Sequence, residues 1–296
     1  MKTININSFL LLILLLHSCE KMVVDVNLPE QEPVIVLNAI IETDKPIIVN
    51  ISKGIGILDT TKQAIIENAI VEIFENGNFK EKLTYTKDGN YISNLVLPQY
   101  GNKYKVIASA PGFKEVSAET SLPSHVTVSN IIIKDSVHFD ANINLNGSNA
   151  VGSISFTLHD PMESNYYLLE MSYRDSLQSY PIYIDISDSQ LESFNNMENP
   201  MFNDTYFNGK DFRIEVFFNS YYLNFQDYST SGIPKPEVSF NISTINHEFY
   251  IYKKSVLKQF FSIGNPFAEP APVYSNIKNG LGVFLGKNNN YIEIRK

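Results

Sequence analysis

Five histidines are the first candidates for metal binding or proton transfer: His17, His125, His138, His159 and His247. No two of them have the His-Glu-x-x-His spacing that places two imidazoles on one helix face for zinc. The chain also lacks the Gly-x-Ser-x-Gly turn of many hydrolases and the glycine-rich loop that holds phosphates. The sequence therefore predicts no metal site, no cofactor and no enzymatic activity.

Carboxylates offer the remaining catalytic alternative. Asp185, Asp188 and Glu192 could supply oxygens to calcium, but acidic residues at the start of a helix explain them equally well. Asp185 with Glu192 is the pair that a carboxylate-based hydrolase would use. Nothing in the sequence holds these two carboxyl groups at a fixed separation, so this is the least favoured of the three functions that the sequence leaves open.

The single cysteine has a specific chemical setting. Residues 9–16 form an apolar run that is too short to span a membrane but suits a secretion signal. The run leads into Leu-His-Ser-Cys at residues 16–19, which resembles the lipobox of bacterial lipoproteins. In that chemistry the signal is cut between Ser18 and Cys19, and the cysteine thiol carries a diacylglycerol. We therefore expect residues 1–18 to be a signal peptide and Cys19 to hold the mature protein on a membrane through its acyl chains.

The composition narrows the classes of partner. Of the 296 residues, 44% are hydrophobic, which is enough for a sizeable core. The 32 acidic residues outnumber the 23 basic ones, and a net charge of −9 disfavours binding to nucleic-acid phosphates. A single cysteine excludes an internal disulfide.

Short alternating strands separated by turn signals fill most of the chain. They predict an all-β protein with two β-sandwich regions, Ig-like or transthyretin-like, and one amphipathic helix packed on the C-terminal domain. The expected divisions are a lipidated tether at 19–32, a first sandwich at 33–125 that folds alone, and a second β-rich domain at 126–296. Tight turns are expected at Asn76-Gly77 and at Asp88-Gly89.

An apolar stripe predicts the helix at 245–262, with Thr244 as its N-cap. We expect this stripe to pack against a sheet. The glycines between residues 280 and 286 are interpreted as positions where the backbone passes close to the helix or forms a bulge. Phe284 and its apolar neighbours should then tie the helix to the second sandwich. The stripe residues are Ile245, Phe249, Tyr252, Val256 and Phe260.

Several longer stretches carry a family resemblance. They are SCEK and VDVNLPEQEPVIVLNAII within residues 18–41, NAIVEIFENG at 68–77, DGNY at 88–91, HEFYIYKKSVL at 247–257 and FAEPAPVYSNIKNGLGVFLG at 267–286. Together they resemble a family of Bacteroidota cell-envelope lipoproteins, catalogued as domain of unknown function 4249. The resemblance implies a cell-envelope lipoprotein, often associated with a TonB-dependent outer-membrane receptor. It implies no catalytic residue.

Three tripeptides resemble the O-glycosylation acceptor of exported Bacteroidota proteins. Their acceptor residues would be Thr60, Ser136 and Ser176. Short patterns of this kind also arise by chance.

The leading functional expectation is a non-enzymatic lipoprotein, anchored by lipid in the outer membrane, that acts as an accessory or binding subunit of a TonB-dependent receptor. Glu20, directly after the cysteine, differs from the aspartate of inner-membrane retention and favours the outer membrane. The alternative is a surface glycan-binding module, with Tyr166-Tyr167 and Tyr221-Tyr222 presenting rings to sugars. The absence of tryptophan counts against this alternative. The sequence leaves the ligand open.

Overall fold

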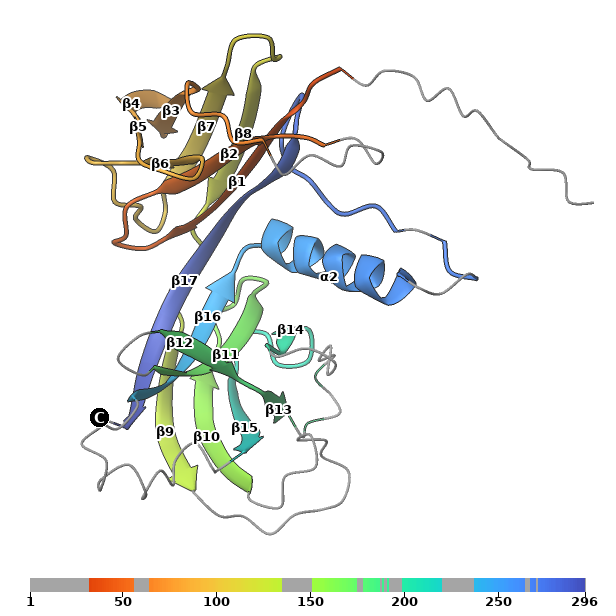
Figure 1. Ribbon diagram of the computed structural model, residues 1–296. Helices are drawn as coiled ribbons and strands as arrows, with labels where there is room; N and C mark the ends of the chain where they lie inside the picture. Colours follow the sequence, from red (N-terminus) through yellow and green to blue (C-terminus); the bar gives the residue numbers. More distant parts are fainter. Residues whose placement is uncertain are drawn as a thin grey trace, which may run out of the picture. The chain divides into compact units, whose positions relative to one another are not determined.

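The computed structural model describes residues 32–55, 64–134, 151–174, 178–186, 188, 191, 199–219, 237–263, 267–269 and 271–295. The predicted signal peptide and nearly all of the tether lie outside these residues. Within residues 33–296, the strands and the one described helix are arranged as shown in Figure 1.

Nine strands form the largest sheet, which we call the central sheet, and they come from both predicted sandwich regions (Figure 1). Their order is β12 (Ser179–Ile182), β11 (Tyr166–Arg174), β16 (Glu237–Ile245), β17 (Leu281–Arg295), β1 (Ile35–Glu42), β2 (Ile48–Lys53), β6 (Asn90–Ile92) and β5 (Thr84–Tyr85), with β14 (Met201–Asn203) paired to β11. β17 runs parallel to β1 on one side and antiparallel to β16 on the other. Its backbone hydrogen bonds therefore join the two regions.

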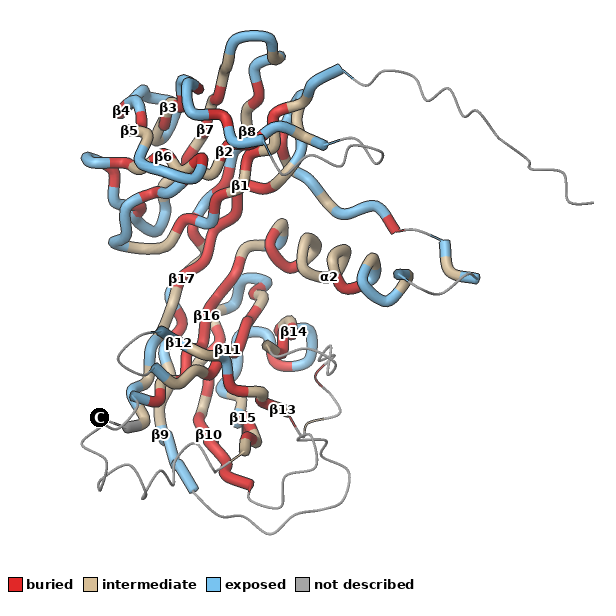
Figure 2. The backbone as a smooth tube through the Cα atoms, in the orientation of Figure 1, coloured by how far each residue is buried: buried red, intermediate tan, exposed pale blue. Residues whose placement is uncertain are grey.

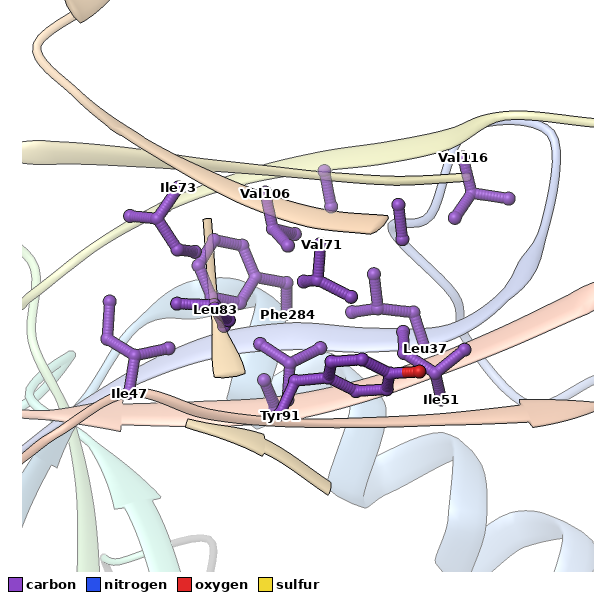
Figure 3. Close-up of a cluster of buried hydrophobic side chains, with 14 of the residues drawn as sticks. Leu37, Ile47, Ile51, Val71, Ile73, Leu83, Tyr91, Val106, Val116 and Phe284 are labelled. Carbon is purple, nitrogen blue, oxygen red and sulfur yellow. The ribbon is translucent and has the colours of Figure 1, made fainter. Parts of the chain in front are cut away.

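A four-stranded sheet packs against the β1–β2 part of the central sheet. Its order is β4 (Asn78–Lys82), β3 (Ile70–Glu75), β7 (Lys103–Ser109) and β8 (Val116–Ser121). Figure 3 shows the apolar core between the two layers, with Phe284 of β17 among the side chains that fill it. The expectation that Phe284 belongs to the second sandwich is therefore wrong, because β17 pairs with β1 at this point and aims the ring at the N-terminal core.

A second four-stranded sheet packs against the β11–β16 part of the central sheet. Its order is β13 (Ile184–Ile186), β15 (Asp211–Asn219), β10 (Val151–His159) and β9 (Thr127–Lys134). Alternate residues of β10 and β16, such as Phe156 and Phe240, meet in its core with ring centroids 5.7 Å apart. The predicted fold class, all-β with two sandwich-like regions and one helix, is confirmed.

Two glycines let β17 approach its neighbours closely. Gly282 has a φ of +103°, and a Cβ at this residue would lie 2.1 Å from the Leu37 carbonyl oxygen on β1. A Cβ at Gly286 would lie 2.1 Å from the Ser121 carbonyl oxygen on β8. Both distances exclude a side chain. The predicted close approach is present, but the neighbours are strands rather than the helix.

Before Lys287, β17 pairs with β1 on one edge but not yet with β16 on the other. Asn276 bonds the backbone on this second edge. Its Oδ1 accepts a hydrogen bond from the Phe284 N–H at 2.9 Å, and its Nδ2 donates to the Phe284 carbonyl at 2.8 Å. One side chain thereby satisfies both backbone groups, as a paired strand would.

Helix α2 (His247–Ser262) begins directly after β16. Its N-cap is Asn246, whose side chain accepts a hydrogen bond from the Phe249 N–H at 3.1 Å. Thr244, the predicted cap, instead belongs to β16, and its hydroxyl donates to the Ser124 carbonyl. The buried residues are Phe249, Tyr250 and Leu257, whereas Phe260 of the predicted stripe is 63% exposed. The helix packs on side chains of β11, β16 and β17. Figure 2 shows buried and intermediate positions along most of the helix and exposed ones near its end.

The two predicted tight turns are confirmed by positive φ angles at Asn76-Gly77 and at Asp88-Gly89. The chain after the first turn forms two strands. β4 ends at Lys82, and β5 joins the central sheet instead. Glu81 is buried, and its carboxylate accepts hydrogen bonds from the backbone N–H groups of residues 94–96 at 2.9–3.0 Å, which offset the loss of water.

Candidate functional site

A groove of about 780 Å³ lies on the face of the central sheet opposite the β11–β16 core. Its walls are residues of β11, β12, β16 and β17, together with Asn199. Helix α2 packs on the same face farther along these strands, over Leu168, Ile245 and Val283. The groove therefore starts where the helix stops covering the sheet.

Successive side chains of a strand point to opposite faces of the sheet, so every second residue faces the groove. On β16, Val238, Phe240 and Ile242 point into the core, so the residues between them point to the opposite face. These are Ser239 and Asn241, and Ser243 continues the same face. Here one face of the sheet is polar, and the opposite face packs on the apolar core.

Asn241 is the centre of a hydrogen-bond network in this groove. Its Nδ2 lies 3.0 Å from Glu170 Oε2, 2.9 Å from Ser243 Oγ and 3.0 Å from Asn289 Oδ1. Lys287 Nζ donates to the same Glu170 oxygen at 2.5 Å, and Ser243 donates to Asn289 at 2.9 Å. These contacts hold side chains from three strands in place before any ligand is present.

The network contains more acceptors than donors. The Asn241 amide carries two hydrogens but lies within hydrogen-bond distance of three acceptors. Among the described residues, its Oδ1 is covered and accepts no hydrogen bond, although Asn241 is only 5% exposed. An unsatisfied buried amide oxygen costs on the order of 1–3 kcal/mol. A ligand hydroxyl that donates to the Glu170 carboxylate, whose side chain is 33% exposed, would relieve the competition for the two Asn241 hydrogens.

Charges in the groove occur in pairs. Lys287 pairs with Glu170, and Arg174 of β11 pairs with Glu237 of β16. Ser172 and Ser239 lie 3.2 Å apart between these two pairs. The two serines therefore form the floor of the groove, and the two ion pairs form its walls.

Tyr291 of β17 is the aromatic residue of the groove and is 58% exposed. Lys45 Nζ lies 5.5 Å from the centre of its ring and 3.4 Å from its hydroxyl. Lys45 also pairs with Glu42, which accepts a hydrogen bond from Asn289 at 2.6 Å. The network around Asn241 and the surroundings of Tyr291 are thus continuous.

A second cluster lies on the outer face of the β13-β15-β10-β9 sheet. His159 Nε2 is 2.7 Å from Ser129 Oγ, and His159 Nδ1 is 2.7 Å from Asp211 Oδ1. This order of contacts is that of a Ser-His-Asp triad, in which the carboxylate orients the imidazole and the imidazole activates the serine. The side chains of His159 and Asp211 are 37% and 68% exposed, so water screens both interactions.

Two buried aspartates hold the loops at the end of the second sandwich region. Asp160 accepts hydrogen bonds from the Tyr167 hydroxyl and from the Gly209 N–H, the latter at 2.7 Å. Asp204 accepts from the Asn165 N–H at 2.6 Å. Burial raises the pKa of both carboxyl groups above their ordinary value. The described residues contain no group of three or more His, Cys, Asp or Glu that could hold a metal ion.

Many of the residues singled out from the sequence lie outside the described residues. They are His17, Ser18, Cys19, Glu20, Thr60, Ser136, His138, Ser176, Glu192, Tyr221 and Tyr222. Asp185 lies in β13, where its Oδ1 accepts a hydrogen bond from the Ile186 N–H at 2.8 Å. Because Glu192 is not described, the proposed carboxylate pair stays a prediction.

The predicted sugar-binding role of Tyr167 is wrong, because this ring is fully buried in the core. Tyr166 is partly buried beneath α2, with its ring centre 4.8 Å from that of Tyr250 and 5.1 Å from that of His247. The aromatic residue that the fold does present beside polar groups is Tyr291. Alternating Val238, Phe240 and Ile242 are a sequence signal for β16.

The described residues include no helix long and apolar enough to cross a membrane. The fold and the groove define an all-β protein with a preorganised polar site on an open sheet face. The family described as domain of unknown function (DUF4249) matches residues 22–291, and the chain belongs to this family. The search of curated proteins found no match.

Proposed function

We propose that this protein is a non-enzymatic binding protein, anchored by lipid in the outer membrane, and that it works as an accessory subunit of a TonB-dependent receptor. The observation that carries the binding role is the polar groove on the central sheet. The lipobox-like motif ending at Cys19 supports the lipid anchor. The apolar run at residues 9–16 before that motif supports export to the cell envelope.

Preorganisation is the physical reason why the groove suits binding. Its polar side chains are held by one another, so little side-chain entropy is lost when a ligand arrives. A volume of about 780 Å³ lies within the range of small-molecule sites. The groove opens on a rigid sheet rather than on a loop, which keeps its donors and acceptors at fixed spacings.

Gentle solubilisation of native membranes, followed by affinity purification of the full lipidated chain, tests this function. We expect a TonB-dependent receptor to co-purify in a stable ratio. Recovery of a monomeric protein without any receptor would contradict the accessory role.

A second candidate function, a serine hydrolase, is favoured by the Ser129–His159–Asp211 hydrogen-bond chain. Ser129 Oγ would attack an ester carbonyl while His159 Nε2 takes the hydroxyl proton. The exposure of this hydrogen-bond chain makes hydrolysis the weaker candidate function, because electrostatic stabilisation in catalysis depends on excluding water. A fluorophosphonate probe decides between the two. Labelling of the wild type that is lost in Ser129→Ala and His159→Gln supports hydrolysis, and no labelling supports binding alone.

A further inference from the structure

We propose that the groove on the central sheet binds a neutral oligosaccharide, with Tyr291 contacting a sugar ring and the Asn241 network contacting its hydroxyl groups. This inference rests on the proposed binding role and names its class of ligand.

The charges of the groove argue against a strongly charged ligand. Its lining contains three glutamates, at 170, 237 and 293, and two basic residues, Arg174 and Lys287. Both basic residues already pair with glutamates. A polyanion would meet carboxylates without an uncommitted cation, and a hydrophobic ligand would leave the serines and asparagines without water.

The hydrogen-bonding inventory favours hydroxyl groups. Around Asn241, three acceptors compete for two amide hydrogens, and Oδ1 of Asn241 has no donor among the described residues. A sugar hydroxyl donates one hydrogen bond and accepts two. It can therefore donate to the Glu170 carboxylate, whose side chain is 33% exposed, and accept from Lys287 or Arg174 on the walls.

The register of the strands places an aromatic ring next to this network. Asn241 lies opposite Glu170 on β11 and opposite Tyr291 on β17, so the three residues form one row across the sheet. In the next row, Ser172 lies opposite Ser239. These small side chains leave a floor on which a ring can lie flat.

Tyr291 suits the apolar face of a sugar. Its ring is 58% exposed, and its position is held by Lys45. An aromatic ring offers a flat apolar contact beside hydrogen-bonding groups, and a pyranose has an apolar C–H face bordered by hydroxyls. The combination of ring, hydroxyl-matched network and paired charges is what a neutral carbohydrate requires.

Calorimetric titration of the purified full chain tests the inference, with neutral oligosaccharides of several linkages and, at matched length, sulfated and uronate-containing ones. We expect binding of at least one neutral oligosaccharide and a reduction of at least tenfold in Tyr291→Ala. A bulky variant, Ser239→Leu, should also weaken binding, because it fills the floor of the groove. The matched control is Tyr100→Ala, which removes a ring of similar exposure, 56%, in the loop before β7; it should leave the affinity unchanged.

Unfolding midpoints of the three variants show whether each is folded, so that a lost signal reports on the groove. The inference is overturned if no neutral oligosaccharide binds, if only charged ones bind, or if both groove variants bind as well as the wild type. Co-purification of the receptor together with no carbohydrate binding would overturn the inference and leave the accessory role standing. Carbohydrate binding by a monomer that purifies without a receptor would support the inference and contradict the accessory role.

Discussion

Replacing Phe284 with alanine tests whether β17 completes the N-terminal core. The ring is fully buried among side chains of the first sandwich region, although it lies more than 150 residues away from them in the chain. Emptying a buried aromatic site costs about 3–5 kcal/mol, and the cost rises when the surroundings cannot collapse into the cavity.

The backbone at Phe284 has little freedom to move. It pairs with Ala39 of β1, and Asn276 bonds both its N–H and its carbonyl. Gly286, two residues on, is pressed against the Ser121 carbonyl. We therefore expect a loss in the upper part of the range, about 4–5 kcal/mol in the free energy of unfolding.

Urea denaturation of the purified full chain measures this loss. Phe260→Ala is the matched control, because that ring is 63% exposed and its removal should change stability by no more than about 0.5 kcal/mol. A loss below about 1 kcal/mol for Phe284→Ala would mean that the ring is not packed as described. Unchanged stability together with a lost partner would instead assign Phe284 to binding.

Three further predictions concern the anchor, the domain boundary and a buried acid. Cys19→Ala should leave the fold intact but release the protein from membranes, as fractionation and labelling with radioactive palmitate would show. A fragment of residues 30–125, which the strand pattern predicts to fold alone, lacks the Ile277 and Phe284 side chains of its core, so we now expect no cooperative thermal transition. Burial raises the native pKa of Asp160 above its unfolded value, so its contribution to stability falls as the pH rises from about 4 through the raised pKa. Asp160→Asn should therefore flatten the dependence of the unfolding free energy on pH in that window.

Each of these predictions has a result that contradicts it. A Cys19→Ala protein that stays in the membrane fraction would refute the lipid anchor. A cooperative transition in the 30–125 fragment would show that β17 is dispensable for the first core. For Asp160→Asn, urea midpoints measured at pH 4.5 and 7 should lie closer together than in the wild type. An unchanged separation would show that Asp160 titrates normally.

The sequence by itself determined the features that depend on neighbouring residues. Positive φ angles at Asn76-Gly77 and Asp88-Gly89 follow from the residue types of the turns. Alternation along short segments correctly predicted an all-β class, and one periodic stripe predicted a helix near its true bounds. The lipobox-like motif at 16–19 is likewise a local pattern. Such signals need only a few consecutive residues.

Only the tertiary structure decided which strands lie side by side. Alternation shows that a strand has two faces, but it does not tell which partner it pairs with or in which register. For this reason the sequence assigns the whole C-terminal segment to the second sandwich. β17 does pair with β16 there from Lys287 onward, but its first part pairs with β1 and places Phe284 in the first core. The groove likewise depends on which strands pair. Glu170, Asn241 and Tyr291 stand far apart in the chain and meet in one row because β11, β16 and β17 are neighbours in a single sheet.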